Sequence, residues 1–223
     1  MKKYDLLITG VGGQGVILAS NITGEVALAS GYDVKKTDTL GMAQRGGSVI
    51  SHLRIAPKVF SPLIRQGKAD ILLAFEKLEA ARWSHYLKPG GIAIINNQAM
   101  PPLSVNLGNE CYPDDKDIID ILRYQTNNFY FIEGVSRARE IGNVKALNIF
   151  MLGCLSHFMP FEDNVWQDCI TKSLPSKVVE LNIAAFNQGR KAGKKRNERF
   201  IHRESGVYRC LRRKMKQKIM CPG

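Results

Sequence analysis

The chain has no closely spaced pair of cysteines. Its 223 residues include five cysteines, and no two of them form a Cys-x-x-Cys pair. A ferredoxin-type iron–sulfur cluster or a zinc ribbon needs such spacing, so neither is expected from this chain alone. Cys154 and Cys169 fall within apolar, helix-like stretches, where we expect them to pack as small hydrophobic side chains.

Long apolar runs are also missing. No segment is long and apolar enough to predict a membrane-spanning helix. Lys2 and Lys3 precede apolar residues in the manner of a signal peptide, but Asp5 interrupts that run. We therefore expect a cytoplasmic protein.

Acidic residues are scarce only at the end of the chain. Residues 190–223 hold thirteen Lys or Arg and two acids, a balance of +11 out of a total of +12. The first 189 residues are therefore nearly neutral, and a nucleic-acid function inferred from the net charge would describe only the tail. We predict one domain over residues 1–189 and a basic C-terminal tail over 190–223. The tail is expected to be disordered or partly helical, with a basic amphipathic helix for an anionic surface as the alternative.

Strand-like and helix-like segments alternate along the first 189 residues. Strands are predicted at 4–9, 33–37, 48–55, 70–75, 92–96 and 129–132, and helices at 16–30, 76–86, 117–124, 144–159, 162–174 and 176–189. Residues 87–91 are predicted to form a turn, and 97–115 a long loop or an excursion with an edge strand. This alternation predicts an α/β fold, a three-layer α/β/α sandwich with a Rossmann-like, mostly parallel sheet.

A glycine-rich loop follows the first strand and opens the first helix. It contains Gly12, Gly13, Gln14 and Gly15 in the sequence Gly-Val-Gly-Gly-Gln-Gly. In a Rossmann unit such a loop holds a ligand phosphate at a helix N-terminus. A dinucleotide site also needs an acid for the ribose, and neither Asp33 nor Asp38 has the usual placement. A glycine turn used for packing or protein contact is the favoured interpretation.

A second glycine loop follows the second strand. It contains Gln44, Arg45, Gly46 and Gly47, so an amide, a guanidinium and backbone N–H groups are offered together. Such donors suit a carboxylate, a phosphate or a partner's backbone. The alternative is a turn with a solvated arginine. Because both loops follow strands at the carboxyl edge, we expect them to lie side by side.

Two further polar residues are candidates at the same edge. His52 lies on the strand after the second loop, where contact with neighbouring backbone is favoured over acid–base work. Glu76 ends the third buried strand and is a candidate to orient the loop arginine. His85 and His157 have no second histidine at metal-ligand spacing, so we expect both to be structural and predict no metal site.

Five blocks of sequence carry a resemblance to a known family. They are YDLLITGVGGQGV at 4–16, GMAQRGGSV at 41–49, SPLI at 61–64, ADILLAFE at 69–76 and YLKPGG at 86–91. Together they resemble the gamma-type subunit or domain of the 2-oxoacid:ferredoxin oxidoreductases, and in particular the beta subunits of the indolepyruvate type. The resemblance covers about residues 3–190.

The resemblance implies a subunit of a thiamine diphosphate and iron–sulfur dependent enzyme that is inactive alone. Such enzymes decarboxylate a 2-oxo acid, here an arylpyruvate such as indolepyruvate, to an acyl-coenzyme A and reduce ferredoxin. Thiamine diphosphate, Mg²⁺ and 4Fe–4S clusters are expected on a partner alpha subunit and no cofactor on this chain. Asn96-Asn97 and Asn127-Asn128 lack the Gly-Asp-Gly that precedes the Asn pair of a thiamine motif. The resemblance assigns no catalytic residue to this chain and makes Gln44 and Arg45 the best candidates to contact the partner. The oligomeric state of the isolated chain is left open, with a homo-oligomer as one alternative.

Two other classes of function remain open. A nucleotide-binding oxidoreductase of the Rossmann type requires an open first glycine loop. A module that binds nucleic acid or membrane would depend on the basic tail alone, since the rest of the chain is nearly neutral.

Overall fold

A computed structural model describes residues 2–41 and 46–200, the last seven of them as backbone only. Gln44 and Arg45 of the second glycine loop lie outside the described residues, as does the tail from residue 201. No helix among the residues described is long and apolar enough to cross a membrane.

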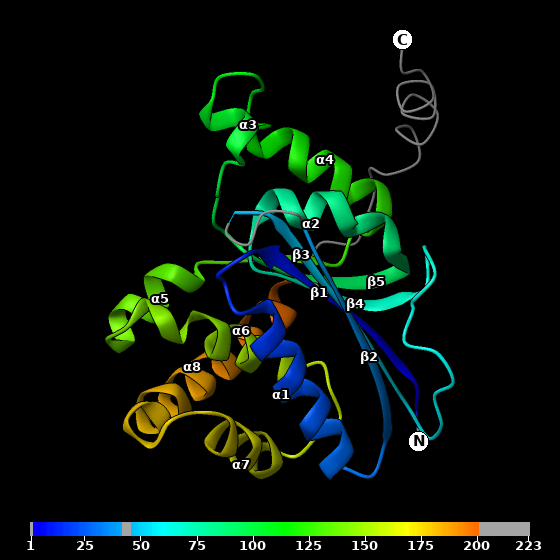
Figure 1. Cartoon of the computed structure of the whole chain (residues 1–223), viewed down its shortest axis with the longest axis vertical. Coiled ribbons are helices and arrows are strands. Elements are labelled where there is room, and N and C mark those ends of the chain that lie inside the picture. Colours follow the sequence, from blue (N-terminus) through cyan, green and yellow to red (C-terminus); the bar gives the residue numbers. More distant parts are fainter. Residues whose placement is uncertain (1, 42–45, 201–223) are drawn as a thin grey trace.

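A six-stranded sheet forms the centre of the molecule in the order β2-β3-β1-β4-β5-β6 (Figure 1). The strands are β1 (Tyr4–Val11), β2 (Asp33–Leu40), β3 (Ser48–Ala56), β4 (Ala69–Ala74), β5 (Leu87–Asn96) and β6 (Phe129–Ile132). β3 is antiparallel to both of its neighbours, and the other pairs are parallel. Five strands therefore share one direction, so that their carboxyl ends lie at one edge of the sheet.

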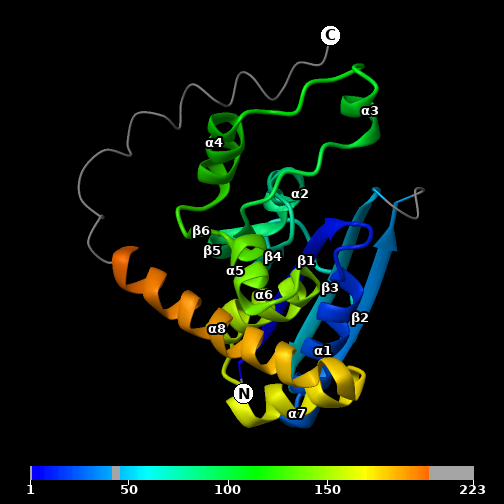
Figure 2. The ribbon, with the colours of Figure 1, turned by 90° about the vertical axis from the view of Figure 1, so that its left-hand side faces the viewer.

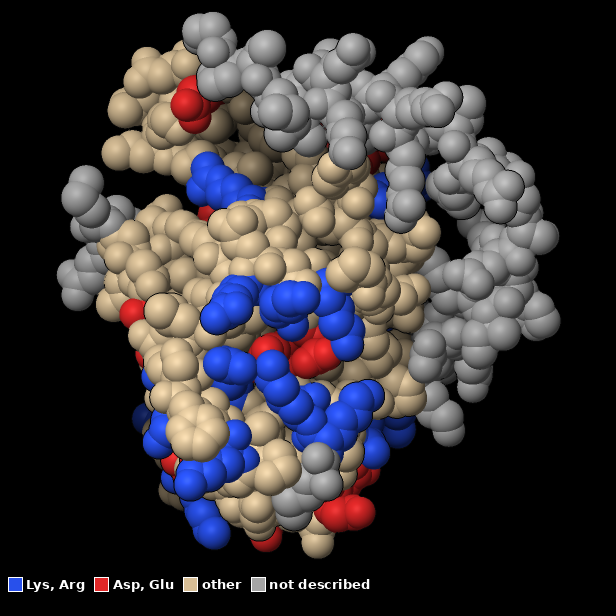
Figure 3. All heavy atoms as spheres, turned by 90° about the vertical axis from the view of Figure 1, so that its right-hand side faces the viewer, with Lys and Arg blue, Asp and Glu red and all other residues tan. Residues whose placement is uncertain are grey.

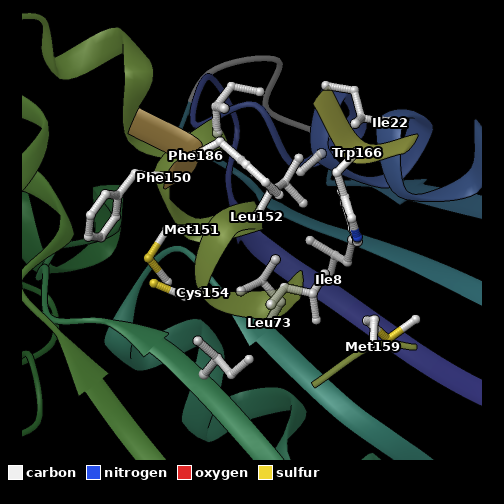
Figure 4. Close-up of a cluster of buried hydrophobic side chains, with 14 of the residues drawn as sticks. Ile8, Ile22, Leu73, Phe150, Met151, Leu152, Cys154, Met159, Trp166 and Phe186 are labelled. Carbon is white, nitrogen blue, oxygen red and sulfur yellow. The ribbon is translucent and has the colours of Figure 1, made fainter. Parts of the chain in front are cut away.

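Five helices cover one face of the sheet. They are α1 (Val16–Ala29), α5 (Gly134–Ile141), α6 (Leu147–Ser156), α7 (Asp163–Ser173) and α8 (Ser176–Phe200), with the short helix η2 (Val144–Ala146) before α6 (Figure 2). Their core includes Ile8, Phe150, Trp166 and Phe186, all at most 1% exposed (Figure 4). α6 is buried throughout except Asn148, in accord with its nearly all-apolar sequence.

The opposite face carries a smaller layer. It consists of α2 (Lys77–Trp83), the short helix η1 (Ser84–Tyr86) and α4 (Asp115–Gln125), while α3 (Leu103–Asn106) precedes α4. Leu7, Leu72, Ile95, Ile118 and Leu122 form its buried core. Two cores on opposite faces of one sheet make three layers, which confirms the predicted α/β/α sandwich with a mostly parallel sheet.

Helices α6 and α8 approach so closely that glycine is required between them. A Cβ at Gly153 would lie 2.1 Å from the carbonyl oxygen of Phe186, and one at Gly189 would lie 2.0 Å from that of Phe150. Both distances are far below van der Waals contact, so any larger side chain would force the helices apart.

Two segments on either side of β5's main pairing depart in detail from the sequence predictions. The turn at 87–91 is instead the first part of β5: Leu87 pairs with Ala69, but Ile92 pairs with Ile71, so the extra residues bulge out of the ladder. Gly90, at φ 75°, allows that bulge. Residues 97–115, all of which are described, form no edge strand; they are a long loop that contains the short helix α3 and ends on the first residue of α4.

The last helix also runs past its expected end at Gly189. α8 continues to Phe200, and Arg190 pairs with Asp163 at 2.7 Å and donates to the hydroxyl of Ser156 at 3.2 Å. Helix α8 therefore continues through residue 190, where the tail was expected to begin. The domain boundary at 189 stays a prediction.

Candidate functional site

The two glycine loops meet at the carboxyl edge of the sheet. The N–H of Gly12 donates to the carbonyl of Gly47 at 2.8 Å, which confirms that the loops lie side by side. Gly13, Gly15 and Gly46 have φ values of 103°, 83° and 82°. These left-handed conformations favour glycine and turn the chain sharply after the carboxyl end of β1 and before the amino end of β3.

Gln14 ties the first loop to its surroundings. Its Oε1 accepts from the N–H of Val11 at 2.8 Å, and its Nε2 donates to the carbonyl of Phe75 at 3.1 Å and approaches the sulfur of Met100 at 3.1 Å. The amide is thus used to join the end of β1 to the end of β4 and to the excursion after β5. Asn148 closes the other side, since a Cβ at Gly15 would lie 2.6 Å from its Nδ2.

These contacts favour packing over nucleotide binding. Asp33 begins β2 and therefore lies at the opposite edge, where it accepts from the N–H of Val59 at 2.8 Å. That backbone donor, helped by Lys35 and Lys58, lowers the pKa of the Asp33 carboxyl below its ordinary range. Asp38 is paired with Lys36 at 2.9 Å.

The second loop is the tip of the β2–β3 hairpin. Gly41 donates its N–H to the carbonyl of Ser48 at 2.8 Å, which closes the base of the loop. Gly46 and Gly47 are described and join this base to the first loop, while the roles of Gln44 and Arg45 between them stay predictions.

A buried carboxylate missed by the sequence analysis fixes that base. Glu79 is 3% exposed and accepts from the hydroxyl of Ser48 and from Nε1 of Trp83, the latter at 3.2 Å. Arg82 pairs with its other oxygen at 2.8 Å. The available signal was a second acid three residues after Glu76, the spacing that often marks a helix N-terminus.

Glu76 is the N-cap of α2 and is almost completely buried. Its carboxylate accepts from the N–H of Glu79 at 2.8 Å, the N–H of Met100 at 3.1 Å and the hydroxyl of Tyr112. Burial, then the hydrogen bond to Glu76 and then the charge of Glu76 raise the pKa of the Tyr112 phenol. The carboxylate thus joins α2 to the excursion; its role as an orienter of Arg45 stays a prediction.

His52 lies within the smaller core. Its Nδ1 accepts from the N–H of Ile64 at 3.3 Å, and its ring packs edge-on against Tyr86 at 5.4 Å between centroids. Burial lowers its pKa, so the ring is neutral and holds a loop. These contacts match the favoured structural interpretation.

Apolar side chains are exposed around the same edge. Leu40, at the end of β2, is 61% exposed, and Leu103 and Leu107, in and just after α3, are 70% and 65% exposed. Exposed apolar groups near ordered loops are typical of a surface that another protein covers.

No metal site is evident within the described ranges 2–41 and 46–200, where no group of three His, Cys, Asp or Glu side chains is arranged to hold an ion. Cys154 and Cys169 are buried in the larger core, as expected.

Comparison with known proteins defines the class. The family model for pyruvate ferredoxin/flavodoxin oxidoreductase matches residues 5–192. The chain is 39% identical over 197 residues to indolepyruvate oxidoreductase subunit IorB of Pyrococcus horikoshii, covering 87% of this chain and 98% of that protein. It is 37% identical to the subunit of the same name from Thermococcus kodakarensis, with the same coverage.

Solved structures agree on the fold. The gamma subunit of a keto/oxoacid ferredoxin oxidoreductase from Geobacter sulfurreducens superimposes with a TM-score of 0.64 at 24% identity, over 86% of this chain and 99% of that one. The chain belongs to the pyruvate ferredoxin/flavodoxin oxidoreductase family. The predicted class, a small subunit of a 2-oxoacid:ferredoxin oxidoreductase, is thereby confirmed, as is the resemblance to its indolepyruvate type.

Proposed function

We propose that this chain is the subunit without cofactors of an indolepyruvate-type 2-oxoacid:ferredoxin oxidoreductase and that it acts in the cytoplasm. Its partner is a thiamine diphosphate-binding alpha subunit, whose thiamine diphosphate, Mg²⁺ and 4Fe–4S clusters decarboxylate the 2-oxo acid, reduce ferredoxin and allow acyl transfer to coenzyme A. The naming of two relatives for indolepyruvate oxidoreductase supports the substrate class.

The joined glycine loops at the carboxyl edge are the observation that carries this proposal. Gly12 and Gly47 are hydrogen-bonded, and Gln14 and Glu79 anchor one loop each. Two loops held in this way present a preorganised edge, and the exposed leucines beside it favour a protein partner. In this proposal the edge docks on the alpha subunit, and Gln44 and Arg45 contribute donors to the contact.

Reconstitution tests the proposal. The purified chain is titrated into the purified alpha subunit, and ferredoxin reduction is followed with indolepyruvate and coenzyme A. We expect a stable complex and activity that neither chain shows alone. Full activity of the alpha subunit alone, or no complex, would refute the proposal.

Substitution of Arg45 tests the edge itself. Arg45→Ala is expected to leave the unfolding midpoint unchanged and to lower turnover or weaken assembly, because a residue of a glycine-rich loop is expected to contribute little to the core. Lys116→Ala, an exposed change on α4, is the matched control. Wild-type turnover and wild-type subunit affinity for Arg45→Ala would make the arginine a solvated turn residue.

The nucleotide-binding alternative has less support. Gln14 fills its hydrogen bonds internally, and Asp33 lies at the far edge of the sheet. Titration with NAD and NADP should therefore give no binding at millimolar concentration.

A further inference from the structure

The β3–β4 loop, residues 57–68, lies at the amino edge of the sheet, opposite the glycine loops. It holds Lys58, Arg65 and Lys68 and no acid. Phe60 is 86% exposed and Leu63 is 60% exposed. An apolar centre with a charged surround is the usual anatomy of a protein interface.

This loop is held firmly although it contains no helix or strand. The Arg54 guanidinium of β3 donates to the carbonyl of Ser61 at 3.0 Å, and the N–H of Ile64 donates to His52 at 3.3 Å. Both supports come from buried or half-buried side chains of the sheet. Phe60 is therefore presented to solvent by a fixed backbone, which lowers the ordering cost of binding.

The charge of this face is positive. Figure 3 shows Lys and Arg side chains gathered around a few acids in the centre of one face. The buried Asp5 is already neutralised by Lys3 at 2.7 Å and Arg54 at 3.0 Å. In contrast, no salt bridge joins Lys58, Arg65 or Lys68 to an acid among the described residues, although the charge of Lys58 acts on Asp33 at the start of β2.

We infer that residues 57–68 form a second docking surface, which binds an acidic face of the alpha subunit; this inference rests on the proposed function. The positive charge of the loop argues for an acidic partner. It argues against a second copy of the chain, which would bring the same basic loop against itself, and against the chain's own tail, which carries +11. The exposed Phe60 and Leu63 favour a permanent subunit over a transient partner, because permanent interfaces bury more apolar surface.

Charge reversal tests the inference. The triple variant Lys58→Glu, Arg65→Glu, Lys68→Glu is titrated against the alpha subunit at low and at high salt. We expect its Kd to rise about tenfold or more at low salt and less at high salt, where charges are screened. The matched control, Arg139→Glu, Lys172→Glu, Lys177→Glu, changes three exposed basic residues on α5, α7 and α8 and should bind nearly like the wild type.

The apolar centre is tested separately. Phe60→Ser with Leu63→Ser should raise the Kd about tenfold or more at both salt concentrations, since buried aromatic anchors dominate interface energies. Leu28→Ser, which removes a half-exposed leucine from α1, is the control. The unfolding midpoints of the loop variants should match that of the wild type, because the changed side chains are exposed.

The outcomes separate the two proposals. If the wild-type chain does not bind the alpha subunit, the proposed function fails, and this inference fails with it. If the wild type binds and both loop variants bind equally well, only the inference is overturned. A rise in the KM for ferredoxin, a loss of DNA binding or a change in self-association, with unchanged affinity for the alpha subunit, would assign the loop to another occupant and also overturn it.

Discussion

The two edges of the sheet use the same device to build different surfaces. At the carboxyl edge, Gln14 and Glu79 bind and fix glycine-rich loops. At the amino edge, His52 and Arg54 fix residues 57–68 in the same manner. The carboxyl edge exposes leucines near the glycine loops, and the amino edge exposes Phe60 among lysines and arginines. Gln14, His52 and Arg54 bind backbone atoms of the loops, so their anchoring does not depend on the side chains that a loop exposes. Glu79, on α2, instead binds the side chains of Ser48 and Trp83.

Loss of Glu79 should give the largest effect on stability. Glu79→Ala leaves the hydroxyl of Ser48 without its acceptor, leaves the indole N–H of Trp83 only the hydroxyl of Ser48 at 3.3 Å, and removes the partner of Arg82, which should lower the free energy of unfolding by about 3 kcal/mol. Urea unfolding measures this cost. Glu140→Ala, which removes an exposed pair with Arg137, should cost less than about 1 kcal/mol; equal costs would show that Glu79 does not anchor the carboxyl edge.

Gln14 should have an intermediate effect. Gln14→Ala removes an acceptor for Val11 and a donor to Phe75, at a cost of about 1 to 2 kcal/mol. Hydrogen exchange should accelerate at residues 10–15 and leave the 57–68 loop unchanged. Equal acceleration at both edges would contradict the view that each loop has its own anchor.

The amino edge should be the one that responds to mild acid. Burial lowers the pKa of His52 below its ordinary value of about 6.5, so the unfolded chain takes up the proton first as the pH falls. The stability that His52 contributes is complete above pH 6.5 and is lost as the pH falls toward the lower pKa of the folded state. Protonation also removes the acceptor for the N–H of Ile64.

Urea unfolding between pH 5 and 8 checks this dependence. His52→Asn keeps an acceptor but cannot titrate, so it should be less stable than the wild type at pH 8 and show a flatter dependence on pH. If the free energies of unfolding of the two proteins changed in parallel with pH, His52 would not be the source of the pH dependence.

Removal of residues 201–223 should have the smallest effect on stability. A chain that ends at Phe200 keeps Arg190 and its pair with Asp163, so its unfolding midpoint and its assembly should match those of the full chain. The cut lowers the formal net charge from +12 to +6 and should weaken salt-sensitive binding to DNA or anionic vesicles. If the shortened chain failed to assemble, the tail would be a docking element, as proposed for the 57–68 loop, and not a dispensable segment.

Elements with strong apolar patterns were predictable. β6 was predicted at its observed bounds, and β1 and α1 within two residues, because burial on the sheet imposes a regular pattern. The bulge at the start of β5 was not predictable from the sequence. A Lys-Pro-Gly-Gly sequence is typical of a turn, and only the pairing of Leu87 with Ala69 makes it part of a strand. α8 was predicted too short because its last turns are basic, while Arg190 finds its acid partner on α7.

The sequence alone determined the layer architecture, the pair of glycine loops and the family, because local periodicity and fixed backbone requirements leave direct traces in residue order. Tertiary structure decided which polar side chains anchor those loops: Glu79 meets Ser48 across 31 positions and Gln14 meets Phe75 across 61. It also decided that a nearly neutral domain carries a basic face. Charge balance is a sum over the chain, but an electrostatic surface depends on which charges are neutralised by neighbours in space.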